Sequence, residues 1–578
     1  MYLAELSIKN FRRLNDVRLN FVPGLNVLVG PNNVGKTAVV DALRALLAGT
    51  DDPYPRFDTD DIHLPKGGTA TGDIKFEYLF RDLSAEDEAD FLHALRPGKE
   101  GKIEAVLGVV YGEPDKSGRL RSRKWCGHHD DILVNMGMLE NLRSVYLPPL
   151  RDAAQGLKPS RTSQLSRLLN LLSDETGRTA IETSLKTLDD ELKKHQPIVD
   201  TQNAIVTRHK AMLGGQFAQA LNIGLSASDF QKLASRISLL VDAFEIESNG
   251  LGYNNLIYMA VVLSELVKNA DAAFRGLIVE EPEAHLHPQL QSVLLRYLSE
   301  LDLVANEKPV QVFVTSHSPN FASIAKLTTL SCLVDAGTKI ESFHPREVKF
   351  EKGKREKLER YLDVTRAELF FARRVIFVEG AAELLMINLL AKRSGTDLRD
   401  NGISLISVEG LNFDSFMPLF GKSAIKIPVA ILTDADPAAA EVEGEDPVAV
   451  YPKADEAVEP SDNAVSMKKR EDEFVKIFYG VKTFEYDFAL HKENRLVMLD
   501  TLEELHPRIG KALRIEVEGA AGDAAAAKVL FKGLFERKEN NVQKGRFAQA
   551  LAARIEDDNV AVVIPPYILS AIGHASQK

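Results

Sequence analysis

The stretch Gly30-Pro31-Asn32-Asn33-Val34-Gly35-Lys36-Thr37 decides the fold of the first half of this chain. Two glycines flank four residues and are followed by Lys-Thr, which is the pattern of a phosphate-binding loop. The mostly apolar stretch at 25–29 (Leu-Asn-Val-Leu-Val) predicts a buried strand before the loop, and residues 38–47 predict a helix after it. Because N–H groups and the dipole at a helix start favour phosphate, we predict a nucleotide site here.

The same stretch predicts how the nucleotide is held. Lys36 is expected to reach the terminal phosphates, and the hydroxyl of Thr37 to hold Mg²⁺. Asn32 and Gly35 belong to the loop and are expected among the residues that bind ATP. The predicted cofactors are therefore ATP and Mg²⁺.

Composition is that of a soluble globular protein with several domains. The chain has 578 residues, of which 45% are hydrophobic and 27% charged, and its net charge is −12. That charge argues against nonspecific binding of nucleic acid by the whole surface and leaves a local basic groove open. Cys126 and Cys332 lie too far apart in sequence for a disulfide framework or a thiolate zinc site. No apolar run approaches about 18 residues, so we expect a cytoplasmic protein with no membrane contact.

Strands and helices alternate along most of the chain, which predicts an α/β fold. Residues 160–215 differ, since they are polar and carry leucines at helical spacing. We expect two or three helices there, projecting as an arm. A second α/β block is expected to begin at Arg374.

A phosphate loop needs a partner strand that ends in carboxylates, and residues 276–283 supply one. Three apolar residues place Glu280 and Glu281 at the carboxyl end of that strand, where open α/β sheets bind ligands. Glu280 is expected to bind Mg²⁺, directly or through water. Glu281 is expected to orient and deprotonate the attacking water.

Two further motifs surround this strand. Ser248 and Gly250 precede a predicted helix at 256–266 and form another anion site. One nucleotide does not need two such sites, so we predict a dimer in which this loop caps the nucleotide of the partner. His317 follows the apolar strand at 310–314 and is placed to contact the γ-phosphate and report its loss.

The order of these motifs resembles the ABC-type ATPases of chromosome maintenance and DNA repair. The opening Ile8-Lys9-Asn10-Phe11-Arg12 looks like the N-terminal strand motif of that family, which implies that Arg12 contacts the phosphates. The chain departs from the family in three ways. Glu280 stands where the family has Asp, the signature loop is incomplete, and no Gln precedes Gln155, so Asp60, Asp61 or His63 is left as a stand-in.

The second block carries acidic residues at two strand ends. Glu379 follows the apolar run 375–378, and Glu383 comes four residues later at a helix start. Asp434 and Asp436 follow the strand at 428–433. Four carboxylates at adjacent strand ends cannot all ionise unpaired, so they predict divalent metal, Mg²⁺ or Mn²⁺.

This pattern resembles the Toprim fold of topoisomerases, primases and certain nucleases. Residues 483–487 add Glu485 and Asp487, expected at alternate positions of a strand. Lys544 lies ahead of a predicted helix and offers the cation that a phosphate-cleaving site needs.

An ABC-type ATPase followed by a Toprim block resembles the overcoming-lysogenization-defect (OLD) family of nucleases. The resemblance implies an ATPase domain at 1–365 with a helical insertion at about 155–220, and a Toprim nuclease domain at 370–578. It also implies a two-metal DNA endonuclease that forms homodimers or higher oligomers and acts in phage defence or DNA repair. Lys544 is the implied catalytic lysine, and the implied metal ligands are Glu379, Glu383, Asp434, Asp436, Glu485 and Asp487.

Other functions stay open at this point. The chain could be an ATP-dependent DNA-binding clamp or scaffold without nuclease activity, and a helicase-like partner is possible. A topoisomerase would need a nucleophilic Tyr in a separate DNA-binding domain, which is not evident. A primase usually brings a zinc module, which two cysteines cannot build.

Overall fold

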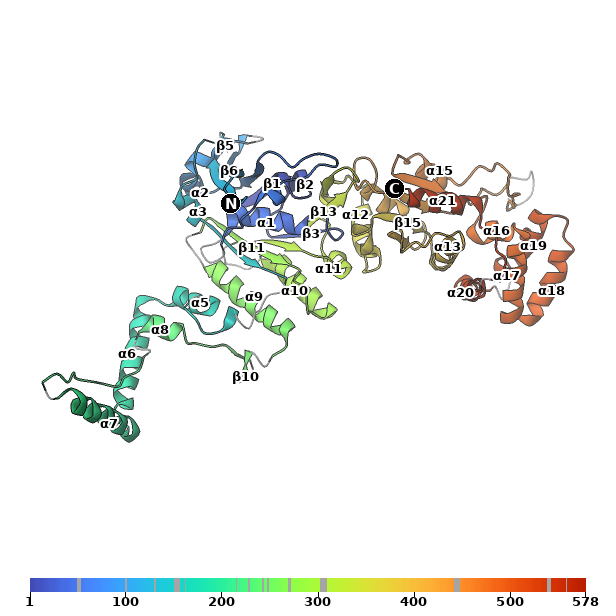
Figure 1. Cartoon of the computed structure of the whole chain (residues 1–578). Coiled ribbons are helices and arrows are strands. Elements are labelled where there is room, and N and C mark those ends of the chain that lie inside the picture. The colour runs from blue at the N-terminus through green and yellow to red at the C-terminus, as the bar shows by residue number, and fades with distance from the viewer. Residues whose placement is uncertain are drawn as a thin grey trace. The chain divides into compact units, whose positions relative to one another are not determined.

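The computed structural model describes residues 1–577 apart from 49–52, 99–100, 129–130, 150–155, 162, 215, 227–228, 242–243, 247–248, 269–271, 302–308, 441–447, 538–541 and 558 (Figure 1). By their contacts the residues group into two compact units. The first unit holds Met1–Phe11, Phe21–Asn26 and Thr37–Thr315, and the second holds Arg12–Asn20, Val27–Lys36 and Ser316–Lys578.

A largely antiparallel sheet gathers the strands of the N-terminal region. Its order is β2-β1-β4-β6-β5, with β7 paired to β6. The strands are β1 (Tyr2–Phe11), β2 (Leu14–Asn20), β4 (Ile74–Arg81), β5 (Leu95–Pro97), β6 (Ile103–Pro114) and β7 (Leu120–Cys126).

A second sheet has the order β14-β13-β3-β12-β11-β8 and supplies the strands of the nucleotide motifs. Its members are β3 (Leu25–Val29), β8 (Leu142–Leu147), β11 (Phe274–Glu280), β12 (Gln311–Thr315), β13 (Leu330–Asp335) and β14 (Ile340–Phe343). All five residues of β3 are buried, and α1 (Lys36–Leu47) follows the phosphate loop. The predicted strand, loop and helix are therefore confirmed.

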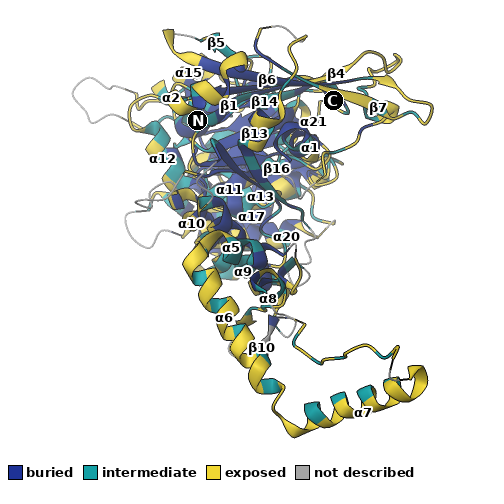
Figure 2. Cartoon of the chain, turned by 90° about the vertical axis from the view of Figure 1, so that its left-hand side faces the viewer, coloured by how far each residue is buried: buried dark blue, intermediate teal, exposed yellow. Residues whose placement is uncertain are grey.

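Helices fill the long segment between β8 and β11. They are α5 (Gln164–Leu172), α6 (Glu175–Leu192), α7 (Gln196–Leu213), α8 (Phe230–Ala234) and α9 (Leu251–Lys268), with the short strands β9 (Leu240–Val241) and β10 (Phe244–Glu245). None of the residues of α6 and α7 is buried, and both helices are exposed along most of their length in Figure 2. The helices predicted for 160–215 are confirmed, and their role as an arm stays a prediction.

The third sheet is fully parallel, with the order β16-β15-β17-β18. Its strands are β15 (Arg374–Val378), β16 (Ile403–Ser407), β17 (Val429–Leu432) and β18 (Val475–Phe478). Because the carboxyl ends of parallel strands meet at one edge, the residues after β15 and β17 lie close together. The α/β prediction for this block is confirmed.

Helices cover this sheet and build its core. Buried residues of α13 (Ala381–Arg393), α16 (Phe484–Ala489) and α21 (Pro566–Ser576) pack into one apolar cluster with β15 and β17. The remaining helices of the chain are α2 (Ala85–Asp90), α3 (Met136–Glu140), α10 (Pro288–Glu300), α11 (Pro319–Ile324), α12 (Lys354–Tyr361), α14 (Phe413–Phe416), α15 (Asp462–Lys468), α17 (Lys492–Leu505), α18 (Pro507–Glu518), α19 (Asp523–Phe535) and α20 (Lys544–Ile555). Among the residues that the structure describes, no helix combines the length and apolar character that crossing a membrane requires.

Candidate nucleotide site and metal centre

The phosphate loop places the charge of Lys36 inside its own curve. The Lys36 side chain is buried, and its Nζ donates to the carbonyl oxygens of Gly30 and Pro31 at 2.5 and 2.8 Å. Gly35 has a φ of +105°, and a Cβ there would lie 2.8 Å from the Leu14 side chain. The loop therefore needs glycine at this position.

Thr37, the next residue, meets the end of β11. Its hydroxyl hydrogen-bonds to the Glu280 carboxylate, and the Tyr146 hydroxyl donates to Glu280 Oε2 at 2.8 Å. Burial raises the pKa of Glu280 above its ordinary value, and the charges of Asp41 and Glu281 add to the rise. The two residues predicted to hold Mg²⁺ are therefore in direct contact, and a cation there would relieve the cost of burying the carboxylate.

Glu281 and His317 leave the sheet at the same edge. β11 and β12 run parallel with Glu280 opposite Thr315, and Glu281 donates its N–H to the Thr315 carbonyl at 2.9 Å. Glu281 has a φ of +44°, a conformation that residues other than glycine seldom adopt. His317 lies two residues beyond Thr315 and is exposed. The roles of Glu281 in water activation and of His317 in phosphate sensing stay predictions.

Four other residues are predicted to bind the nucleotide. Arg12 has a φ of +49° and is partly buried, and Asn32 is exposed. Gly250 is exposed directly before α9, whereas Ser248 lies outside the described residues. The roles of these four residues stay predictions.

Asp61, one of the predicted stand-ins for the missing Gln, has a local role. Its carboxylate accepts the backbone N–H of Asp58 at 3.1 Å, which caps the short helical turn Thr59–Asp61. This bond fixes the turn, and the role of Asp61 as a stand-in stays a prediction.

The acids of the third sheet meet at its carboxyl edge. Oε1 of Glu379 accepts from the Thr433 hydroxyl at 2.6 Å and from the Asp434 backbone N–H at 2.8 Å. The first strand end is thus tied to the tip of β17. The expectation that Glu379 and Asp434 lie together is confirmed by this contact.

Glu383 joins them from the first turn of α13, where its Oε2 accepts the Gly380 N–H at 3.1 Å. Burial raises the pKa of Glu383, and the nearby Glu485 and Glu379 charges raise it further. Burial also raises the pKa of Asp434 well above its ordinary value. The nearby negative charges add to this rise, in the order Glu379, Glu485, Glu383 and Asp436. Such mutual repulsion among buried carboxylates is what a divalent cation would remove.

Asp436 stands at the rim of this cluster, with a φ of +38°. Its N–H donates to the Lys482 carbonyl at 3.1 Å. Burial raises the pKa of Asp436, while the positive charges of Lys482 and Lys544 lower it.

The prediction that residues 483–487 form a strand is wrong, because they open the helix α16. Positions two apart on a helix point about 200° apart, so Glu485 and Asp487 diverge instead of sharing a face. Glu485 faces Lys544, whereas Asp487 Oδ1 accepts the backbone N–H groups of Val481 and Lys482 at 3.1 and 3.2 Å. Burial raises the pKa of Asp487 to about 7. Its proposed role as a metal ligand therefore competes with its bracing of this turn.

Lys544 begins α20, as predicted, and brings a cation to the acids. Its Nζ lies 3.0 and 3.1 Å from the two carboxylate oxygens of Glu485. Burial lowers the pKa of Lys544, but Glu485, Asp434 and Glu383 more than offset this, so the pKa is raised and the side chain stays charged.

The donor set fits hard divalent cations, although the carboxylates do not form a ready cage. Within the described ranges, no group of three or more His, Cys, Asp or Glu side chains already surrounds a single point. A pocket of about 10 Å³ lies between Glu379, Glu383 and Asp434, which is about the space that one water fills. Glu379 accepts its described hydrogen bonds through Oε1, and Asp434 accepts the Phe484 N–H through Oδ1. Each carboxylate therefore keeps its second oxygen for a metal.

Two neighbours of the cluster were not predicted. Tyr567 lines the same pocket. Burial raises the pKa of its phenol well above the ordinary value of 10, and the charges of Asp487 and Asp434 raise it further. Thr433 orients Glu379, as described above. Neither residue belongs to a recognised motif. The one signal for Thr433 in the sequence was its position at the end of a predicted strand, directly before Asp434.

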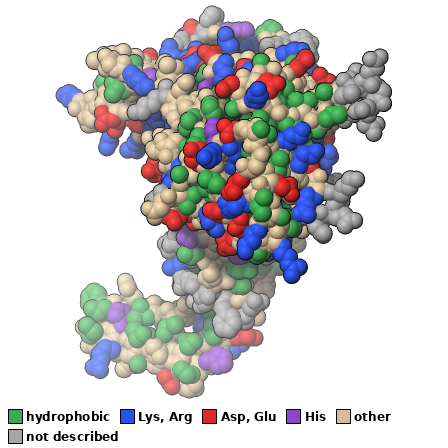
Figure 3. Space-filling model, turned by 90° about the vertical axis from the view of Figure 1, so that its right-hand side faces the viewer, with side chains coloured by type: hydrophobic (Ala, Val, Ile, Leu, Met, Phe, Trp, Pro, Cys, Tyr) green, Lys and Arg blue, Asp and Glu red, His purple; other side chains and the backbone are tan. Residues whose placement is uncertain are grey.

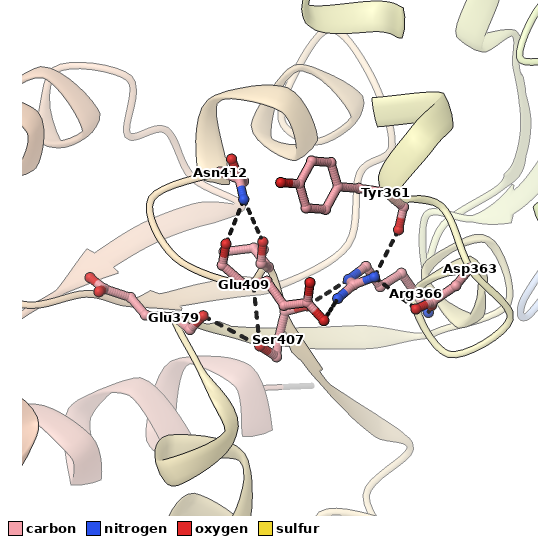
Figure 4. Close-up of polar contacts among 8 residues, drawn as sticks. Tyr361, Asp363, Arg366, Glu379, Ser407, Glu409 and Asn412 are labelled. Atoms are coloured by element: carbon pink, nitrogen blue, oxygen red, sulfur yellow. Dashed lines mark hydrogen bonds and ion pairs between the residues drawn. The ribbon is translucent and has the colours of Figure 1, made fainter. Parts of the chain in front are cut away.

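Arg366, also unpredicted, supports the other side of Glu379 (Figure 4). Its guanidinium donates to the Ser407 carbonyl at 2.9 Å and lies 2.6 Å from the Glu409 carboxylate. The backbone carbonyl of Glu379 in turn accepts the Gly410 N–H at 2.8 Å and the Ser407 hydroxyl at 3.3 Å. Arg366 therefore holds the loop that borders this acid.

Comparison with known proteins identifies the class of each of the two domains. A family described as "AAA ATPase domain" matches residues 1–116 and 139–322, and one described as "Overcoming lysogenization defect protein-like, TOPRIM domain" matches residues 370–436. The fold and the two sites thus define an ATPase joined to a Toprim domain. The chain belongs to the family described as "AAA ATPase domain", and its residues 370–436 are similar to the Toprim domain of OLD-like proteins.

Two curated relatives and one solved structure are similar to parts of this chain. The OLD nuclease of Thermus scotoductus is 25% identical over 75% of this chain and 82% of its own length. Endonuclease GajA of Bacillus cereus is 22% identical over 72% of each chain. The solved C-terminal region of the Burkholderia pseudomallei OLD protein is 26% identical, covers 36% of this chain and 97% of its own, and has a TM-score of 0.25.

Proposed function

We propose that this chain binds and hydrolyses ATP and cuts DNA in a metal-dependent endonuclease reaction. The observation that carries the proposal is the contact of Glu379 with Thr433 and Asp434 at the edge where Glu383 and Lys544 also converge. The relatives named nuclease and endonuclease support it.

The residues divide the work between binding and charge balance. Glu379, Glu383 and Asp434 would hold one divalent cation, and Asp436, Glu485 and Asp487 are the proposed ligands of a second. When bound, two such ions supply an activated water and stabilise the leaving 3′ oxygen. Thr433 orients Glu379 for this task, and Lys544 neutralises the charge that develops on the reacting phosphate.

The nucleotide site would control this reaction. Lys36, Thr37 and Glu280 hold the phosphates and Mg²⁺ of ATP, Glu281 activates water, and His317 senses the γ-phosphate. Capping by the loop at Ser248 and Gly250 of a second copy would make a homodimer the working unit. Higher oligomers, a helicase-like partner, a cytoplasmic setting, and a role in phage defence or DNA repair stay predictions.

Incubation with supercoiled plasmid tests the nuclease proposal. We expect nicked and linear DNA with Mg²⁺ or Mn²⁺, none with EDTA, and a rate that changes when ATP is added. ATP-dependent DNA binding without strand scission under every metal condition would instead support the alternative, an ATP-dependent clamp or scaffold.

A further inference from the structure

Three lysines surround the ring of Tyr451 in the Toprim region. The Nζ atoms of Lys482, Lys528 and Lys532 lie 4.7, 5.0 and 5.7 Å from the centroid of that ring. Lys528 and Lys532 are four residues apart on α19, so they lie on the same side of the helix, and both are exposed. Lys482 is buried and comes directly before the cap of α16.

Lys482 lies near the Asp436 and Asp487 carboxylates, whose pKa values its charge lowers, whereas Lys528 and Lys532 are the exposed charges of the cluster. Among the described side chains, none of the three ammonium groups forms an ion pair, and the one carboxylate at the ring, that of Glu536, accepts a hydrogen bond from the Tyr451 hydroxyl. Figure 3 shows a face of the molecule on which positive and negative side chains are interspersed, in keeping with the net charge of −12. Three cations around one ring repel one another, and an anion placed between them would remove that repulsion.

Packed rings, of which those of Tyr486 and Phe531 are buried, connect the lysine cluster to the helices that carry Glu485 and Lys544. The Tyr451 ring lies 5.7 Å from that of Tyr486, which stands between Glu485 and Asp487 on α16. Rings also connect it to Lys544, whose Nζ is 5.5 Å from the Phe535 centroid. The ring centroids of Phe535 and Phe531 are 5.6 Å apart, and those of Phe531 and Tyr451 are 6.4 Å apart.

We propose that the exposed Lys528 and Lys532, which lie beside Tyr451, bind the backbone phosphates of DNA that flank the phosphate cut at the metal centre. This inference rests on the proposed nuclease function, because it assigns the neighbouring subsite for the same substrate. The cluster supplies positive charge without a base-reading group, so it contributes affinity that falls with salt and does not select a sequence.

Removal of two lysines tests this assignment. The variant Lys528→Gln/Lys532→Gln keeps the side-chain stems and the helix propensity of α19. Binding of a labelled DNA duplex is measured by fluorescence anisotropy from 50 to 200 mM salt, with Ca²⁺ in place of Mg²⁺. We expect the slope of log affinity against log salt to fall by about 2 and the affinity at 150 mM salt to fall about tenfold. The maximal nicking rate at saturating DNA and the ATPase rate should not change.

A matched control and a rescue complete the experiment. Lys392→Gln/Lys511→Gln removes two exposed lysines from other helices of the same region and should bind DNA like the wild type. Lys528→Arg/Lys532→Arg keeps the charges and should retain the wild-type salt slope. A salt slope of Lys528→Gln/Lys532→Gln equal to that of the wild type or the control would overturn the inference. Failure of the wild type to cut plasmid would contradict the nuclease function alone, because the binding slopes are measured without cleavage.

Discussion

Lys544 Nζ lies 3.0 Å from Oε1 of Glu485, although 59 residues separate the two in the chain. The pair joins the start of α20 to the first turn of α16 and aims a cation at the carboxyl edge of the parallel sheet. A charged lysine beside metal-binding carboxylates is suited to stabilising a phosphate on which negative charge develops.

Replacement of Lys544 should therefore slow the chemical step. We expect Lys544→Gln to lower the single-turnover nicking rate about 100- to 1,000-fold, the usual cost of losing one charge-stabilising group. Arg546→Gln is the matched control, since it removes an exposed cation two positions further along α20. Nicking by Lys544→Gln at the rate of the control would show that Lys544 has no catalytic role.

The cluster around Asp434 predicts a pH-dependent stability in the absence of metal. The raised pKa of Asp434 means that this carboxyl binds its proton more tightly in the folded protein than in the unfolded chain, where the pKa of Asp is about 3.9. The resulting stability is present below that value and is lost as the pH rises through the folded-state pKa. Asp434→Asn keeps an oxygen for Phe484 N–H and removes the charge, so in EDTA at pH 8 it should melt at a higher temperature than the wild type.

Divalent metal should stabilise the wild type more than Asp434→Asn. Adding Mn²⁺ is expected to raise the melting temperature of the wild type by several degrees and that of Asp434→Asn much less, because binding to the folded state stabilises it. Equal stabilisation of both proteins by Mn²⁺ would show that the ion binds elsewhere.

Glu281 should govern ATP hydrolysis without governing ATP binding. Its place one residue beyond Glu280 leaves the Thr37–Glu280 contact intact when its charge is removed. We expect Glu281→Gln to lower the ATPase rate by about 100-fold or more while nucleotide affinity stays near that of the wild type. An unchanged steady-state ATPase rate would exclude Glu281 as the base.

Arg366 should position the metal site through the loop it holds. Arg366→Gln is expected to lower the nicking rate at limiting Mn²⁺ by about tenfold, the lower range seen when a residue that supports a metal ligand is replaced. High Mn²⁺ should restore much of that rate, and Arg366→Lys should lose less. A loss of rate that does not depend on Mn²⁺ concentration would point to a structural role only.

Motifs with strong local rules were predictable from the sequence, whereas long-range partners were not. The strand at 25–29 has its predicted bounds because four of its five residues are apolar and it ends at a glycine loop. Residues 483–487 looked like a strand because aromatic residues alternate with acids, yet Thr483 caps a helix by accepting the Tyr486 N–H. A Thr cap followed by acids in the first turn was the overlooked signal. Arg366 and Tyr567 carry no motif, and only folding brings them to the acids.

The central claim is that the acidic strand ends hold cations that hydrolyse DNA, and the nicking rate of Glu379→Gln/Asp434→Asn on supercoiled plasmid with Mn²⁺ and ATP tests it most directly. Glu341→Gln, which neutralises a carboxylate outside the cluster, is the control. The account predicts a loss of nicking of about 1,000-fold or more, because both substitutions remove charge from the proposed ligands of one cation, with the ATPase rate retained. Nicking at the control rate would contradict it.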